Sequence, residues 1–324
     1  MTYRWLLPDH LEDLLPESAW CLEGARRLLL DTLRGKGYQL VIPPLVEFVE
    51  SLAVESGQEL GPLAFSLVDP LSGRQLGLRP DMTLQAARID AHGMNHQGVN
   101  RLCYAGSVVQ THPEAPTRSR EPFQVGAELY GVAGLEGDLE ILNLLLACLE
   151  QLGLNEVRVD VGQVALFRRM VEQAGLNRSQ AAQVTEILQQ RDVPSLKRWA
   201  HALPAPWNWR FSALGGLNGP PGQVLEAARQ ALAGWADLES MLAPLDAVRQ
   251  HLPAHTALSF DLAELRGVHY HSGLVFAVYC PGFAEAVARG GRYDDIGESF
   301  GQARPAVGFS LDLKALLPRL KTFQ

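Results

Sequence analysis

Lysine is scarce in this sequence. The chain has 324 residues, and nearly all of its 28 basic residues are arginines, because its only lysines are Lys36, Lys197, Lys314 and Lys321. With 36 acidic residues, the formal net charge is -8. An acidic chain without lysine-rich stretches has no general attraction to nucleic acid or to an anionic membrane surface. We therefore expect neither partner, although the composition leaves room for a local arginine patch.

Cysteines and long hydrophobic runs are also scarce. The four cysteines lie far apart in apolar stretches, at Cys21, Cys103, Cys148 and Cys280. This spacing favours buried thiols over metal or redox centres. No apolar run is long enough to cross a bilayer, and the first residues carry acids and prolines instead of the features of a signal peptide. We expect a globular protein of the reducing cytoplasm, with 47% hydrophobic residues to build its core.

Hydrophobic periodicity predicts an α+β core interrupted by a helical insertion. Helices are expected over 17–36, 81–92 and 137–153. Strands are expected over 39–44, 65–69, 74–79, 101–110, 123–131, 157–162, 256–262, 271–280 and 283–291, with a last strand and helix over 306–320. Residues 164–253 have a helical pattern in which no strand is expected. The predicted core, 1–163 and 254–324, is therefore a mixed, mostly antiparallel sheet flanked by helices, and 164–253 form an inserted helical subdomain.

Two segments place small polar groups where they could hold an amine. GLRPDMT puts Asp81 and Thr83 at a strand-to-helix junction, where both side chains offer acceptors; taken alone, a helix cap with a neighbouring ion pair explains them better. FQVGAE puts Gln124, Gly126 and Glu128 on one face of a strand, because the side-chain period is two. Gly126 would leave room for a small polar ligand, and an ordinary solvent-facing strand is an equal alternative.

Two later segments combine arginine and tyrosine. RGVHYHSG contains His269 and His271, which would share a face on a strand and could bind a metal, but no third ligand is suggested. We therefore expect polar pocket lining and no metal site. GGRYDD sets a glycine pair beside Tyr293, and glycine permits close approach of the backbone to a ligand, although a turn explains the pair almost as well.

Taken in order, these segments resemble the catalytic core of histidyl-tRNA synthetase, a class II aminoacyl-tRNA synthetase. GYQLVIPPLVE is similar to its first motif, LRPDMT to its LRPE-x-T segment, and 104–131 to its second motif. RGVHYHSG is similar to RG-x-DYYT, and AVGFSLDLKAL to the third motif. The resemblance implies that fold and a homodimer paired through the first motif. It also implies that histidine would be bound by Asp81, Thr83, Gln124, Glu128, Arg266, Tyr270, His271 and Tyr293.

The departures from that family lie mainly at its nucleotide site. Gln110 stands where the second motif carries an arginine for the α-phosphate of ATP, and Ala315 stands where the third motif carries another. Losing one positioned transition-state donor typically costs ~2.7–4 kcal/mol, so adenylation should be slow. Arg118 and Arg120 remain in the intervening loop and could still meet an anion. His271, with His269, replaces part of the histidine-specific pattern.

A synthetase core without these arginines resembles a second family, the regulatory subunits of ATP phosphoribosyltransferase, and LRPDMTLQAARIDAH fits it well. Because the sequence ends at 324, we expect no anticodon-binding domain. The resemblance implies a non-catalytic protein without a cofactor. It would join the short-form catalytic subunit in a hetero-octamer for the first step of histidine biosynthesis and mediate feedback by histidine. Two alternatives stay open: a divergent ligase that activates histidine or another amino acid for a non-tRNA acceptor, and a tRNA-binding module.

Overall fold

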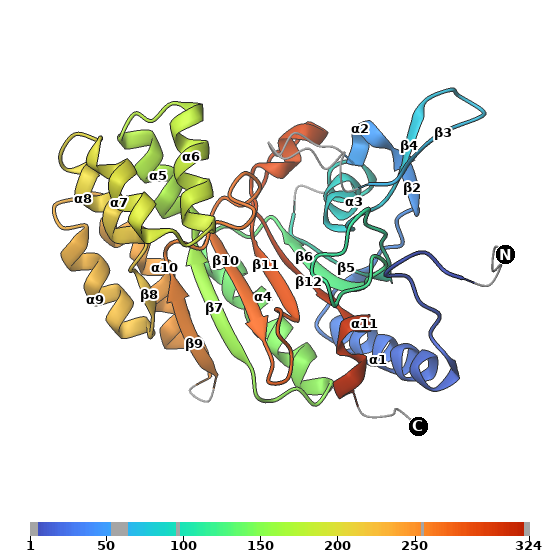
Figure 1. The fold of residues 1–324 in the computed structure, drawn as a ribbon. Helices are drawn as coiled ribbons and strands as arrows, with labels where there is room; N and C mark the ends of the chain where they lie inside the picture. Colours follow the sequence, from blue (N-terminus) through green and yellow to red (C-terminus); the bar gives the residue numbers. More distant parts are fainter. Residues whose placement is uncertain (1–5, 53–63, 95–97, 254–255, 321–324) are drawn as a thin grey trace. The chain divides into compact units, whose positions relative to one another are not determined.

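The chain folds into two compact units, each built around its own part of the β-structure (Figure 1). The computed structural model describes residues 6–52, 64–94, 98–253 and 256–320. The first unit comprises Met1–Asn155, Phe283–Ala288 and Asp294–Gln324, and the second comprises Glu156–Gly282 and Arg289–Tyr293. The boundaries of these units differ from those of the predicted core and insertion. The reason is that several strands of the predicted core belong, with the helices, to the second unit. That division by insertion stays a prediction.

The first unit contains four strands in the order β1-β5-β6-β12. Their bounds are Gln39–Leu40, Asn100–Ser107, Phe123–Tyr130 and Ala306–Asp312. β1 is parallel to β5, whereas β5–β6 and β6–β12 are antiparallel, which confirms the predicted mixed, mostly antiparallel sheet. The strand expected over 39–44 is only two residues long, because Pro43 and Pro44 cannot donate to a ladder.

Two long helices pack on this sheet. α1 (Pro16–Gly35) buries one stripe of side chains, Cys21, Ala25, Leu29 and Leu33, and α4 (Leu135–Gln151) buries most of its apolar residues. α1 contacts α4 and β5, and α4 also contacts β6 and β12 (Figure 1). The chain closes with α11 (Leu313–Leu316) and the short 3₁₀ helix Leu317–Arg319. All four cysteines of the chain are free and buried, and burial raises the pKa of their thiols.

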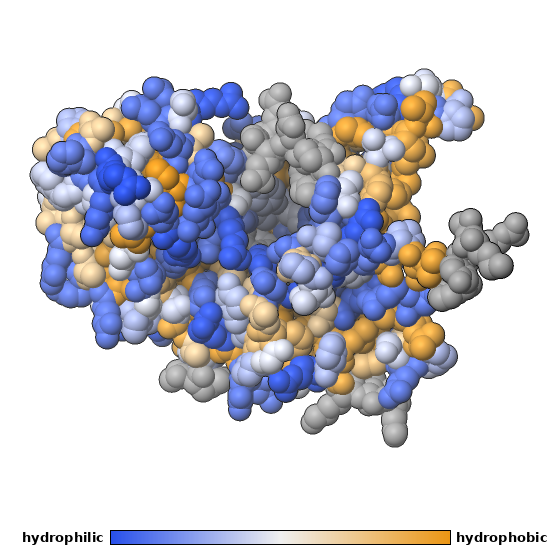
Figure 2. Space-filling model, viewed as in Figure 1, coloured by the Kyte–Doolittle hydropathy of each residue, from blue (hydrophilic) through white to orange (hydrophobic). Residues whose placement is uncertain are grey.

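The predicted hairpin is part of a small second sheet in the first unit. β3 (Ser66–Val68) and β2 (Val46–Phe48) both pair antiparallel with β4 (Gln75–Leu78), and the four-residue helix α2 (Val49–Leu52) follows β2. The hairpin is well exposed; Leu71 at its tip is 95% accessible. Figure 2 shows hydrophobic surface over β2 and β4.

The helix after β4 begins later than predicted and changes form midway. α3 spans Thr83–Arg88, and a π-helix continues it over Ile89–Gly93. The position before the first helical residue is Met82, so the prediction that Asp81 is the N-cap is wrong. Asp81 instead accepts a hydrogen bond from the Thr83 backbone N–H at 2.6 Å, in a turn that precedes the helix. This turn fixes the direction of the Asp81 carboxylate.

The second unit contains the strand order β11-β10-β7-β9-β8. Their bounds are Ala288–Arg292, Leu274–Tyr279, Arg158–Gln163, Ala257–Asp261 and Asn218–Gly219. β10 is antiparallel to β7, whereas β9 is parallel to β7. Two predictions are wrong: β11 begins at Ala288 instead of 283, and β8 lies within the segment where no strand was expected. β8 has two residues that pair with β9, too few to give a strand pattern in sequence.

Six helices of the second unit gather beside β7, β9 and β10 (Figure 1). Their bounds are Val164–Gln173 (α5), Arg178–Gln189 (α6), Val193–His201 (α7), Trp207–Leu214 (α8), Pro221–Ala231 (α9) and Leu238–His251 (α10). Local signals explain their starts: the Asn177 and Gln180 side chains form a capping box for α6, and Asp192 caps α7. Phe211 lies at the centre of the aromatic packing, against Phe167 and Trp199.

Candidate functional site

Tyr104 fills the space that Gly126 opens on the sheet. The two residues face each other across β5 and β6. A Cβ at Gly126 would lie 2.5 Å from the Tyr104 ring, so only glycine permits the ring to lie against β6 at this position. The room predicted above Gly126 therefore exists, but it holds a fully buried tyrosine instead of a ligand.

The Tyr104 hydroxyl links two of the predicted site residues. It donates to Glu128 Oε1 at 2.8 Å and lies 3.2 Å from Thr83 Oγ1. Glu128 is buried as well, and it faces Gly308 on β12. A Cβ at Gly308 would lie 1.6 Å from Glu128 Oε2, so glycine leaves the room for this carboxylate. Burial and the neighbouring carboxylates of Glu128 and Asp81 raise the pKa of the Tyr104 phenol well above its usual value. The phenol is therefore protonated and able to donate.

Gln124 is hydrogen-bonded to Asp81, the remaining predicted site residue of the first unit. Its Nε2 donates to Asp81 Oδ2 at 2.7 Å, and its Oε1 accepts from the Met82 backbone N–H at 3.1 Å. Gln124 is buried, whereas Asp81 and Thr83 are partly exposed. The structure thus brings Asp81, Thr83, Tyr104, Gln124 and Glu128 into one hydrogen-bonded group, here named the acceptor cluster. Two carboxylates and a hydroxyl suit a ligand ammonium group.

The loop between β5 and β6 is here named the arginine loop (residues 108–122). Its two arginines donate hydrogen bonds to backbone carbonyls of the chain. The Arg120 Nε donates to the Gln110 carbonyl at 3.2 Å, and its guanidinium lies 4.9 Å from the Phe65 ring centroid. An Arg118 terminal nitrogen donates to the Ala286 carbonyl at 3.0 Å. Gln110 donates through Nε2 to the Pro80 carbonyl at 3.4 Å, a long hydrogen bond. Both arginines predicted to meet an anion thus have internal partners.

The third-motif segment adds an internal carboxylate near that loop. Asp312 Oδ2 lies 4.0 Å from a terminal nitrogen of Arg118, and Oδ1 accepts from the backbone N–H groups of Phe123 and Lys314 at 3.1 Å each. Burial raises the pKa of Asp312 despite these donors. Ala315 lies one turn into α11 and is partly exposed. Gln110 and Ala315 are both neutral, and that they stand in the place of two arginines stays a prediction.

In the second unit, Tyr270 packs against the other two aromatic residues of the predicted site. Its ring centroid lies 4.9 Å from that of His271 and 5.0 Å from that of Tyr293, which is buried. The His271 ring occupies a slot between two glycines, because a Cβ at Gly267 or Gly291 would come within 3.0 Å of it. Desolvation, with a smaller contribution from the nearby Arg168 charge, lowers the pKa of His271 to about 4, so the ring is neutral near pH 7.

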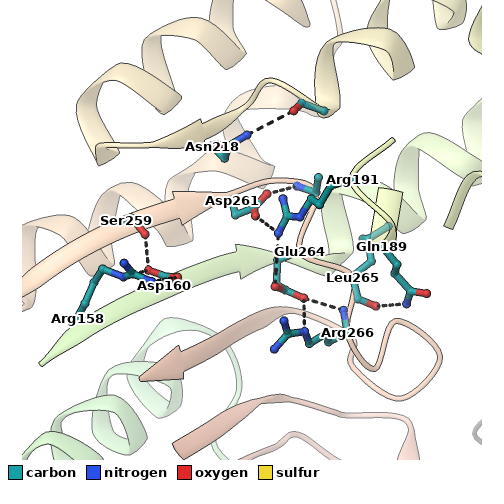
Figure 3. A network of polar contacts seen from close by, with 12 residues as sticks. Arg158, Asp160, Gln189, Arg191, Asn218, Ser259, Asp261, Glu264, Leu265 and Arg266 are labelled. Carbon is teal, nitrogen blue, oxygen red and sulfur yellow. Dashed lines mark hydrogen bonds and ion pairs between the residues drawn. The ribbon is translucent and has the colours of Figure 1, made fainter. Parts of the chain in front are cut away.

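Arg266 and His269 lie toward solvent. The Arg266 side chain is 57% exposed, and its Nε is 3.8 Å from Glu264 Oε1, in a network that also includes Arg191 (Figure 3). The expectation that His269 and His271 share a strand face is wrong, because both precede β10 in an irregular turn. Among the described residues, no group of three or more His, Cys, Asp and Glu side chains could hold a metal ion.

The eight residues predicted to bind histidine divide equally between the units. Asp81, Thr83, Gln124 and Glu128 belong to the first unit, where they form the acceptor cluster; Arg266, Tyr270, His271 and Tyr293 belong to the second. Sequence reasoning missed Tyr104, which connects the acceptor cluster. A tyrosine on one predicted strand and a glycine on the next were visible in the sequence, but only the strand register shows that they face each other.

Comparisons with known proteins identify close relatives over nearly the whole chain. Residues 10–316 match the family described as histidyl-tRNA synthetase. A protein from Chromobacterium violaceum named ATP phosphoribosyltransferase regulatory subunit is 49% identical over 97% of this chain and 82% of its own length. A protein of the same name from Thiobacillus denitrificans is 47% identical over 97% of both chains.

Solved structures support the fold. A Bacillus halodurans structure, described as an ATP phosphoribosyltransferase regulatory subunit/histidyl-tRNA synthetase, matches with a TM-score of 0.87 and 24% identity, over 99% of this chain and 84% of that one. Histidyl-tRNA synthetase from Nostoc matches with a TM-score of 0.78 and 17% identity, over 98% and 75%. The class II synthetase fold predicted from sequence is therefore confirmed. No helix in the described part of the chain is long and apolar enough to span a membrane.

Proposed function

The chain belongs to the family of ATP phosphoribosyltransferase regulatory subunits, and we propose that it acts as the non-catalytic subunit of that enzyme. In this role it joins a short-form catalytic subunit, in a hetero-octamer, for the first step of histidine biosynthesis in the cytoplasm. The relatives of this name, 47–49% identical over nearly the whole chain, carry the proposal.

The chemistry of the arginine loop supports a role without amino-acid activation. Phosphate transition states need cations that point at the reacting oxygens. Gln110 and Ala315 are neutral, and the Arg118 and Arg120 guanidinium groups already donate to carbonyls of the chain. Each guanidinium already uses one of its five donors on the chain, which holds it in place and leaves it less free to turn toward a phosphate. This arrangement favours a regulatory subunit over a divergent ligase.

Histidine is the proposed effector, and the acceptor cluster is its proposed amino-group site in the first unit. Asp81 and Thr83 are partly exposed acceptors whose directions are fixed by Gln124 and Tyr104. That Arg266, Tyr270, His271 and Tyr293 of the second unit bind histidine stays a proposal from the family resemblance. Feedback then requires that histidine favour one of two states of the assembly, with a coupling free energy of about 1–3 kcal/mol.

We further propose that the chain forms a homodimer through the start of the first unit. Large hydrophobic side chains stand out to solvent along α1 and after β1: Trp20 is 66% exposed and Ile42 is 83% exposed. If these side chains belong to one patch, it would be of the kind that marks protein interfaces. Sedimentation of the Ile42→Asp variant should show a shift from dimer toward monomer, and an unchanged dimer would argue against this interface.

The test of the function is ATP phosphoribosyltransferase turnover by a short-form catalytic subunit, measured with and without this protein across a histidine titration. We expect this protein to raise turnover and to make it sensitive to histidine. Unchanged turnover and unchanged histidine response would refute the proposal. Histidine-dependent exchange of pyrophosphate into ATP by the pure protein would support a ligase instead, and salt-dependent binding of tRNA would support a tRNA-binding module.

A further inference from the structure

The hydrogen-bond chain through Tyr104 has a defined direction. A phenol has one proton to donate, and in this chain it goes to Glu128 Oε1 at 2.8 Å. The contact of 3.2 Å between the Tyr104 and Thr83 oxygens must then use the Thr83 proton. The Thr83 hydroxyl therefore donates inward to Tyr104 and keeps its lone pairs for a group on its other side.

We infer that Tyr104 is a positioning residue that makes Thr83 an obligate acceptor, so that the acceptor cluster selects ligands bearing a protonated amino group. The inference rests on the proposed histidine site and deepens it. Without the Tyr104 oxygen, the Thr83 proton is free to rotate toward the ligand, where it would oppose the three protons of an ammonium group. Glu128 thus influences the ligand amino group indirectly, because it orients the Tyr104 hydroxyl, which in turn orients the Thr83 hydroxyl.

The second acceptor of the cluster is fixed in the same sense. Asp81 Oδ1 accepts from the Thr83 backbone N–H, and Oδ2 accepts from Gln124 Nε2. Gln124 cannot flip its amide, because its Oε1 accepts from the Met82 N–H at 3.1 Å. Each carboxylate oxygen retains a further lone pair. Asp81 and Thr83 therefore present acceptors together, and no donor of these two side chains faces a ligand amine.

The structure allows the proton direction to be changed without removing the ring. Tyr104→Phe keeps the ring against Gly126 and deletes only the oxygen. Tyr38 provides the matched control, since it is also buried, belongs to the same unit, and donates to Glu140 Oε1 at 2.9 Å. Tyr38→Phe deletes an equivalent tyrosine–glutamate hydrogen bond outside the acceptor cluster.

The experiment is calorimetric titration of the full-length protein with histidine and with imidazole-4-propionate, which lacks the amino group. We expect Tyr104→Phe to weaken histidine binding about tenfold, the value of one hydrogen bond to a charged group. It should leave the propionate unchanged, and Tyr38→Phe should change neither affinity. As a second pair, Thr83→Val should reproduce the loss and Thr83→Ser should restore binding, because serine keeps the hydroxyl.

The outcomes separate this inference from the proposed function. Equal weakening of both ligands by Tyr104→Phe would indicate a general structural effect and overturn the inference, as would unchanged histidine binding. If wild-type protein binds no histidine, the proposed effector site fails and the inference with it. If Tyr104→Phe does not fold, the two Thr83 variants decide alone. Equal histidine affinities of Thr83→Ser and Thr83→Val would then overturn the inference.

Discussion

The acceptor cluster and the arginine loop both depend on β5 and β6 but use their polar groups in opposite ways. In the acceptor cluster, buried Glu128, Tyr104 and Gln124 support two partly exposed acceptors. In the arginine loop, the two remaining cations donate to backbone carbonyls of the chain itself. The difference supports the proposal that the chain does not bind a nucleotide here, because Arg118 and Arg120, the two cations of the loop, act as structural donors.

The largest expected effect comes from removing the space on which the acceptor cluster depends. Gly126→Ala places a Cβ 2.5 Å from the Tyr104 ring, which has no room to move in a buried position. Overpacking of this kind costs about 1–3 kcal/mol, and histidine binding should weaken as the ring shifts. Urea denaturation and calorimetry measure the two effects.

Gly35→Ala is the control for Gly126→Ala, since nothing lies within 4 Å of the position of its Cβ at the end of α1. It should leave the free energy of unfolding within about 0.5 kcal/mol of wild type. Equal stability of the two alanine variants would show that the Tyr104 ring is not confined.

The second prediction concerns pH and the second unit. His271 has a pKa of about 4 in the folded chain, below the value of about 6.5 expected when unfolded. As the pH falls, His271 therefore becomes protonated in the unfolded chain before it does so in the folded chain. The contribution of neutral His271 to the free energy of unfolding is complete above about pH 6.5 and is lost as the pH falls toward 4. The slope should reach about 1 kcal/mol per pH unit within that window.

Unfolding by urea at pH 7 and pH 5 tests this pH dependence. His271→Asn should be less sensitive to the change of pH than wild type, whereas the exposed His269→Asn should behave like wild type. A His271→Asn variant with the full wild-type pH dependence would contradict the account, because it would assign the proton to other groups.

Sequence patterns predicted the strands that carry the acceptor cluster, because β5 and β6 are each eight residues long and largely buried. They also placed Gln124 and Glu128 on one face. They could not predict that Tyr104 lies over Gly126 or that Arg120 meets the Gln110 carbonyl, because both depend on register and on the path of a loop. The π-helix after α3 and the two-residue β8 leave no periodic signal at all.

The third prediction sharpens the account of the arginine loop. Arg120→Ala removes a hydrogen bond to a backbone carbonyl and a stacking contact with Phe65, so it should lower the free energy of unfolding by about 1 kcal/mol. Arg27→Ala, an exposed helix-surface control, should cost less than about 0.5 kcal/mol. Neither should change binding of Mg-ATP. A clear loss of ATP affinity in Arg120→Ala alone would mean that the loop still serves a nucleotide.

The smallest effect on stability is expected at Arg266. Its side chain is 57% exposed and its nearest carboxylate oxygen is 3.8 Å away, so Arg266→Ala should change the free energy of unfolding by less than about 0.5 kcal/mol. Arg158→Ala is the matched control, with a side chain 56% exposed and an ion pair to Asp160 in the same unit. An arginine that contributes little to folding is available for a ligand carboxylate.

Histidine and histidinol, which lacks the carboxylate, distinguish that role for Arg266. If Arg266 binds the carboxylate, Arg266→Ala should weaken histidine binding about tenfold and leave histidinol binding unchanged. The reason is that one hydrogen bond between charged groups is worth about 1.4 kcal/mol. Arg158→Ala should affect neither ligand. Equal affinities of wild type and Arg266→Ala for histidine would leave Arg266 as a surface residue of the network around Glu264, and the carboxylate would need another partner.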